Sequence, residues 1–176
     1  FGVSKRISPE APIPILENPN EEYKLGGAAN VAANISNIGF DVSLIGKVGN
    51  DKNGDIVKKL LKKNKIKSLM KVIKNEKTII KKRFISNNQQ ILRVDDEKIS
   101  NEDYNNFIKK KIVDGNFSYI IFSDYNKGFI GNISSILKLC RSKGIVTLVD
   151  PKKSSLNYYK FADFIKPNTF ELSKLL

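Results

Sequence analysis

The second half of the chain alternates short apolar runs with segments of helical period, and this alternation constrains the fold more than any other feature. Apolar runs at Tyr119–Phe122, Ile145–Val149 and Phe164–Ile165 predict strands. Apolar residues at spacings of three and four predict helices over Ile133–Arg141 and from about Thr169. Strands that alternate with helices form parallel sheets through right-handed crossovers. The sequence therefore predicts an α/β fold in which helices flank a parallel sheet.

The first half extends the same pattern. The predicted elements are a helix over residues 27–38 that Gly39 ends, a strand over Val42–Val48, a helix through Ile56, Leu60 and Leu61, and a helix that Ser100 and Asp103 open and that runs to about Val113.

Two further segments fit poorly into a parallel layer. The runs Thr78–Ile85 and Gln90–Val94 flank the polar turn Ser86-Asn87-Asn88, which predicts a β-hairpin. Residues 1–25 contain prolines at positions 9, 12, 14 and 19, so they suit edge strands or a covering flap and not a central strand. We therefore expect a small β lid formed by about residues 1–25 and 76–96.

The composition excludes several classes of active site. The chain has no histidine and a single cysteine, Cys140, so the usual zinc sites and serine–histidine or cysteine–histidine nucleophiles are excluded. Cys140 continues the apolar period of its helix, which favours a buried core residue over a reactive thiol. One unpaired cysteine, no apolar run of about 18 residues and no signal peptide predict a cytoplasmic protein with no membrane association.

The net charge of +13 raises the possibility of a nucleic-acid partner. The charge is mostly lysine spread along the chain, and the densest group, over residues 58–65, has no aromatic residues among it that could stack on bases. A solvated lysine surface is therefore the preferred interpretation, and a nucleic-acid patch stays the alternative.

Polar residues that follow predicted strands are the candidates for chemistry, because ligands of parallel sheets bind at the carboxyl ends of the strands. These positions are Gly46–Asp51, residues 123–128 with Asp124 and Lys127, Asp150 with Lys152, and Lys166–Asn168, with Glu171 in the first turn of the helix that follows. A helix start at Gly26-Gly27-Ala28-Ala29-Asn30 adds backbone amides that a ligand can approach closely and a side-chain amide that can pair with a hydroxyl. Each also has a plain structural interpretation: a glycine turn, an aspartate that caps a turn, or a helix cap followed by a first-turn acid.

The glycine segment resembles the first signature of the ribokinase-type (PfkB) carbohydrate kinases. The resemblance continues along nearly the whole chain, through Arg6-Ile7-Ser8-Pro9-Glu10-Ala11-Pro12, Asn88-Gln89-Gln90 with Arg93 and Asp95, Ser123-Asp124-Tyr125 with Lys127-Gly128, Val149-Asp150-Pro151-Lys152, and Pro167-Asn168 with Glu171. The Arg-Ile-Ser-Pro-Glu-Ala-Pro and Asn-Gln-Gln elements are similar to those of the bacterial heptose 7-phosphate kinases. In contrast to that branch, the chain has Asn87 in place of a basic residue and Lys166 in place of a small polar one.

The resemblance implies a ribokinase-like fold and transfer of a phosphoryl group from ATP, with Mg²⁺, to the anomeric hydroxyl of heptose 7-phosphate, a step toward the lipopolysaccharide core. The residues implied to bind the substrate are Gly26, Gly27, Asn30, Lys81, Arg83, Asn88, Gln89, Arg93, Asp124 and Lys127, and those implied near the ATP phosphates and Mg²⁺ are Asn168, Glu171, Asp150 and Lys152. Lys81 and Arg83 alternate along a strand and are expected to share a face. Exposed strand charges without a ligand are the alternative.

The resemblance also implies elements that this sequence lacks. The Gly-Ala-Gly-Asp loop that carries the family's catalytic aspartate has no counterpart in it, and the first strand of the fold would precede Phe1. We therefore expect the 176-residue chain to be a piece of one kinase domain and to be inactive alone. A homodimer through the lid is a further expectation. The alternatives are another ribokinase-type sugar kinase, or a non-catalytic module that binds a sugar.

Overall fold

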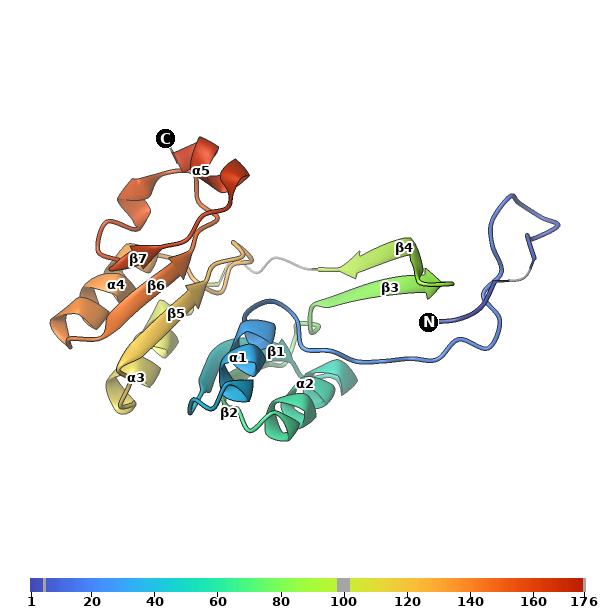
Figure 1. The fold of residues 1–176 in the computed structure, drawn as a ribbon. Helices are drawn as coiled ribbons and strands as arrows, with labels where there is room; N and C mark the ends of the chain where they lie inside the picture. Colours follow the sequence, from blue (N-terminus) through green and yellow to red (C-terminus); the bar gives the residue numbers. More distant parts are fainter. Residues whose placement is uncertain (5, 98–101, 176) are drawn as a thin grey trace.

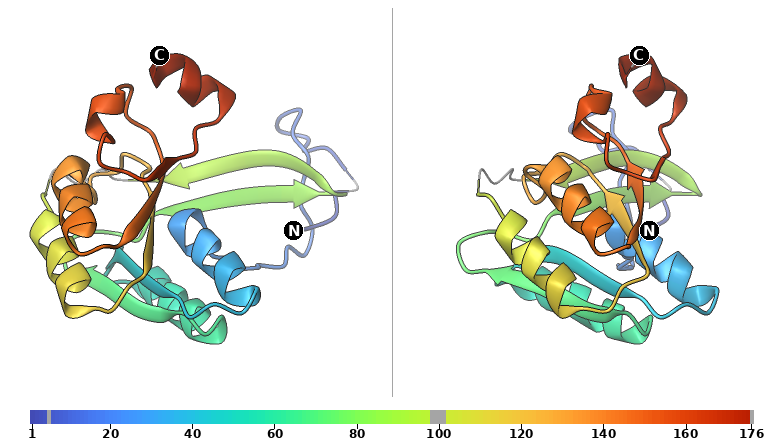
Figure 2. Two further views of the ribbon diagram at one scale, coloured as in Figure 1. Left: turned by 60° about the vertical axis from the view of Figure 1, so that its left-hand side comes forward. Right: turned by 90° about the vertical axis from the view of Figure 1, so that its left-hand side faces the viewer.

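A computed structural model describes residues 1–4, 6–97 and 102–175. The second half forms a three-stranded parallel sheet in the order β5-β6-β7, made of Tyr119–Ser123, Val146–Asp150 and Phe164–Ile165. Helices α3 (Asn105–Asp114) and α4 (Ile133–Ser142) pack together against it (Figures 1 and 2). A short 3₁₀-helix, η1 (Leu156–Tyr158), and helix α5 (Thr169–Leu175) complete this half.

The core of this half contains the apolar residues that set the predicted helical period. Ile136, Leu137 and Cys140 of α4 are fully buried and face Phe122 of β5 and Val149 of β6. Burial also raises the pKa of the Cys140 thiol to about 11. The prediction that Cys140 is a core residue is confirmed.

The first half builds a second parallel pair. Strand β1 (Ser43–Gly49) pairs with β2 (Lys67–Ile73), and α2 (Lys52–Lys63) makes the crossover between them. Helix α1 (Gly27–Asn37) buries Ala32 and Ala33 in the same cluster as Leu44 and Leu61. The α/β fold is confirmed, but the parallel strands divide between two sheets and β2 was not predicted. Lysines at positions 67 and 71 interrupt the apolar pattern of β2, and none of its residues is fully buried.

The predicted hairpin is present as β3 (Ile80–Ser86) paired antiparallel with β4 (Gln89–Asp96). The turn residues Asn87 and Asn88 both have positive φ, 49° and 64°, the backbone that a two-residue hairpin turn needs and that asparagine tolerates. The extended N-terminal segment reaches this turn, where Gly2 bridges to Ser86. Figure 1 shows the hairpin and this segment projecting away from both parallel sheets.

The start of α3 differs in detail from the predicted capping. Ser100 lies outside the described residues, and the Asp103 carboxylate accepts a hydrogen bond from the backbone N–H of Asn105 at 2.7 Å. Tyr104, just before the helix, is buried and stacks on Phe129 with ring centroids 5.5 Å apart. The Lys47 ammonium of β1 lies 5.1 Å from the centre of the Tyr104 ring, so this tyrosine connects the β1–β2 sheet with the half that contains β5, β6 and β7. No helix within the described residues is long and apolar enough to cross a membrane.

Candidate active site

Asp124 lies at the carboxyl end of β5, the position that the sheet topology predicts for a ligand-binding residue. The register places Ser123 opposite Asp150, and the Asp124 N–H donates to the Asp150 carbonyl at 3.3 Å. The Asp124 side chain is 3% exposed, and its Oδ1 accepts from the N–H of Asn126 at 2.9 Å. The turn-capping interpretation is thus correct for one carboxylate oxygen. The other oxygen has a different partner.

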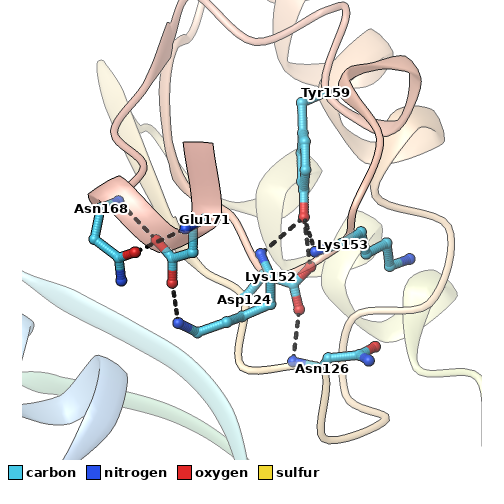
Figure 3. A network of polar contacts seen from close by, with 7 residues as sticks. All are labelled: Asp124, Asn126, Lys152, Lys153, Tyr159, Asn168 and Glu171. Carbon is cyan, nitrogen blue, oxygen red and sulfur yellow. Dashed lines mark hydrogen bonds and ion pairs between the residues drawn. The ribbon is translucent and has the colours of Figure 1, made fainter. Parts of the chain in front are cut away.

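That partner is Tyr159, a residue that the sequence analysis missed. Its hydroxyl donates to Oδ2 of Asp124 at 3.3 Å and accepts from the backbone N–H groups of Lys152 and Lys153 at 3.1 and 2.9 Å (Figure 3). Tyr159 is completely buried, and burial raises the pKa of its hydroxyl, so it stays a donor at neutral pH. The loops after β5 and β6 are therefore held together by one phenol. Only the aromatic character of Tyr159 is visible in the sequence, and it does not identify this role.

Asn168 and Glu171 cap the start of α5 reciprocally. The backbone N–H of Asn168 donates to Oε2 of Glu171 at 2.9 Å, and the N–H of Glu171 donates to Oδ1 of Asn168 at 2.8 Å. The Glu171 carboxylate also pairs with the Lys152 ammonium, which is the main reason that the pKa of Glu171 is lowered. The same hydrogen bond raises the pKa of Lys152. Helix capping is present, and three of the four residues expected near the ATP phosphates, Lys152, Asn168 and Glu171, lie together. The fourth, Asp150, is the last residue of β6 and is not among the residues that line the hollow beside them.

A hollow opens beside this group, lined by Pro151, Lys152, Lys153, Asn168, Phe170, Glu171 and Lys174. Three ammonium groups and one carboxylate give it a positive charge, which suits phosphate oxygens. It does not suit direct coordination of Mg²⁺, because Glu171 is already engaged by Lys152 and Asn168. Within the described residues no cluster of three acidic or cysteine side chains forms a metal site.

The glycine segment meets the same region from the other side. Gly27 has φ +53°, and a Cβ added there would lie 3.3 Å from Cε2 of Tyr125, the residue after Asp124. The start of α1 therefore approaches the β5 loop, as the views in Figure 2 agree. Gly26 and Asn30 are exposed beside it. Gly27, which is far from Tyr125 in the sequence, thus lies beside it in the fold.

The hairpin places its predicted cations on one face. Lys81 pairs with Asp95 and Arg83 with Arg93 in the strand register, and these four residues alternate with a second face that carries Lys82, Phe84, Leu92 and Val94. Lys81 reaches Glu97 at 2.9 Å, and Lys127 of the β5–α4 loop pairs with the same carboxylate. Asn88 and Gln89 lie at the turn, at the opposite end of the hairpin from Lys81.

Glu97 was also missed by the sequence analysis. It continues the alternation of Arg93 and Asp95 on β4, and that spacing is the signal that could have identified it. Lys127 was predicted to bind substrate, but its link to the hairpin was not foreseen.

Two curated relatives align with the whole length of this chain. The sequence is 35% identical over 182 residues to the Bifunctional protein HldE of Haemophilus influenzae strain PittEE, and 34% identical to that of Pasteurella multocida strain Pm70. In both cases all of this chain and 37% of the relative are covered, so the chain spans little more than a third of their length.

Solved structures share the fold at low sequence identity. A carbohydrate kinase from Agrobacterium tumefaciens superposes with a TM-score of 0.70 at 15% identity, covering 98% of this chain and 58% of its own. The tetrameric inhibited form of phosphofructokinase-2 from Escherichia coli gives 0.68 at 17% identity, with the same two coverages. The model of the pfkB family of carbohydrate kinases matches residues 3–176. With that match over nearly all of its length, the chain belongs to the pfkB family of carbohydrate kinases.

Proposed function

We propose that this chain forms the acceptor-binding part of a cytoplasmic kinase that transfers a phosphoryl group from ATP to the anomeric hydroxyl of heptose 7-phosphate, in the synthesis of the lipopolysaccharide core heptose. The observation that best supports a binding site for the acceptor's phosphate is that Arg83 lies directly opposite Arg93 on one hairpin face. Like charges directly opposite each other destabilise a strand pair. Asp95 pairs with Arg93 at 2.9 Å and also with Lys81 at 3.6 Å, so this face keeps a net positive charge that a further anion beside Arg83 would offset. A sugar that already carries a phosphate supplies that anion, and guanidinium groups bind phosphate oxygens in bidentate geometry.

The roles of the other residues follow from their positions. Gly27 and Asn30 at the start of α1 bind sugar hydroxyls, and Asp124, held in place by Tyr159, accepts a hydrogen bond from another hydroxyl. Lys152 and Lys153 pair with phosphate oxygens of ATP in the hollow beside α5, while Asn168 and Glu171 fix the position of Lys152. Mg²⁺ would be held through ATP oxygens and water near Glu171 and Asp150, and when bound it offsets charge on the phosphates.

The chemical step itself needs a group from outside these residues. The anomeric oxygen forms a bond to the γ-phosphorus, the bond to the bridging oxygen of ADP breaks, and the hydroxyl proton passes to a base. We assign that base to a part of the full-length protein beyond this chain. The contribution of these residues is therefore to position the acceptor and to supply cationic partners for both phosphates.

The remaining proposal concerns assembly. The second hairpin face exposes Phe84, Leu92 and Val94 at 39%, 53% and 44%, and an isolated two-stranded hairpin is marginally stable in water. We propose that this lid face packs against the lid of a second copy. A monomeric full-length protein, measured by light scattering at micromolar concentration, would contradict the homodimer without affecting the substrate proposal.

The substrate proposal is tested with the full-length protein and a panel of heptose 7-phosphate, ribose, fructose and fructose 6-phosphate. We expect phosphorylation of heptose 7-phosphate, and the variant Arg83→Gln should raise its KM about tenfold or more through loss of a charged phosphate contact. The matched control is Lys82→Gln, which removes one positive charge from the opposite hairpin face. Turnover only of sugars without a phosphate, or equal effects of the two variants, would overturn the heptose phosphate assignment.

A further inference from the structure

Glu97 joins the hairpin to the loop that follows β5. It follows the last residue of β4, and its carboxylate meets Lys81 of β3 at 2.9 Å and also Lys127, which lies 30 residues further along the chain in the β5–α4 loop. Its side chain is 16% exposed, whereas Lys81 and Lys127 are 43% and 35% exposed. The carboxylate is therefore more enclosed than either of the ammonium groups that it binds.

The net charge on this side of the hairpin matches that of a doubly charged anion. Lys81, Arg83, Arg93 and Lys127 contribute four positive charges, and Asp95 and Glu97 contribute two negative ones. Two positive charges remain, and a phosphomonoester carries −1.5 to −2 at neutral pH. Without Glu97 the two lysines would repel each other, and their long side chains would be free to turn into solvent.

We infer that Glu97 is a positioning residue of the acceptor site. Its carboxylate holds Lys81 of the hairpin and Lys127 of the body at one point, so that both ammonium groups face the phosphate of the acceptor and the hairpin is fixed over the body. The phosphate does not replace Glu97; it binds beside it and pairs with the cations that Glu97 has oriented. This inference rests on the proposed function for the identity of the anion, but not for the link between hairpin and body.

The test uses the full-length protein with Glu97→Gln, which keeps the size of the side chain and removes its charge. The matched control is Asp96→Asn, because Asp96 is the adjacent exposed carboxylate on the opposite hairpin face, across from Ile80. We expect Glu97→Gln to raise the KM for heptose 7-phosphate about tenfold while the KM for ATP changes by less than about twofold. A loss of folding would raise both KM values or lower the active fraction, so the split separates positioning from general damage.

A second measurement needs no substrate. Hydrogen exchange of the β3–β4 amides should accelerate about tenfold in Glu97→Gln and less in Lys127→Met, which leaves the pair of Lys81 with Glu97 in place. The double variant should be no faster than Glu97→Gln alone, because that variant already removes the link to Lys127. Asp96→Asn should exchange like the wild type. If the panel shows no activity on sugar phosphates but this coupling is present, the proposed function fails and the link stands. Additive exchange effects, or an unchanged acceptor KM in an enzyme that uses heptose 7-phosphate, would overturn the inference.

Discussion

Replacing Tyr159 with phenylalanine removes one oxygen atom but three hydrogen bonds, and should therefore clearly lower the free energy of unfolding. The hydroxyl is the common partner of Asp124 from the β5 loop and of two backbone N–H groups from the β6 loop. Phenylalanine fills the same space, so packing is retained and the change isolates the hydrogen bonds. Asp124 loses its Oδ2 donor, and the N–H groups of Lys152 and Lys153 lose their acceptor.

The structure sets the size of the effect. The three hydrogen bonds measure 2.9, 3.1 and 3.3 Å. A buried polar group left without its partner costs about 1–3 kcal/mol, and water can reach the backbone beside the exposed Lys152. We therefore expect a loss of about 2–4 kcal/mol in the free energy of unfolding, equivalent to about 10 °C in Tm for a chain of this length.

Urea unfolding followed by circular dichroism measures this loss. The control is Tyr158→Phe, because Tyr158 is 46% exposed. The Lys153 ammonium lies 4.8 Å from the centre of the Tyr158 ring, and phenylalanine keeps this cation–π contact. We expect this control to lie within about 0.5 kcal/mol of the wild type. If the two variants lose the same stability, the Tyr159 hydroxyl does not hold the two loops together and the account of Asp124 is wrong.

Three further results are expected. Gly27→Ala should cost about 1–2 kcal/mol in urea unfolding because the φ of +53° is unfavourable for alanine, whereas Gly26→Ala, at φ −120°, should be nearly neutral; equal losses would contradict this. The Lys152 ammonium lowers the pKa of the Glu171 carboxyl in the folded protein. The pair therefore stabilises the fold fully at pH values above about 4.3, the pKa of Glu171 in the unfolded chain. This stabilisation is lost as the pH falls through the lower pKa that Glu171 has in the folded protein. Urea midpoints between pH 3 and 6 should therefore depend less on pH in Glu171→Gln, and parallel pH profiles would refute the pairing. The Cys140 thiol, whose pKa is raised to about 11, should react with a disulfide reagent at pH 8 only as fast as the protein unfolds, and fast labelling of the folded protein would contradict its burial.

The sequence by itself determined the local elements and the candidate residues that share a strand face. Three features depend on neighbours a few residues away, so the pattern of the chain reveals them: the helical period of α4, the polar turn of the hairpin, and the alternation of Lys81 with Arg83. The reciprocal cap of Asn168 and Glu171 belongs to the same class, because its two partners are three residues apart.

Only the tertiary structure decided which loops meet and which side chains hold them. The Tyr159 hydroxyl reaches Asp124 across 35 residues, and Glu97 reaches Lys127 across 30. No local spacing encodes either contact. The first arises because the parallel crossovers bring the loops after β5 and β6 to one edge of the sheet, and the second because the antiparallel hairpin ends beside the β5–α4 loop. The division of the strands into two sheets has the same origin, since strand pairing depends on long-range packing and hardly at all on the composition of a segment such as β2.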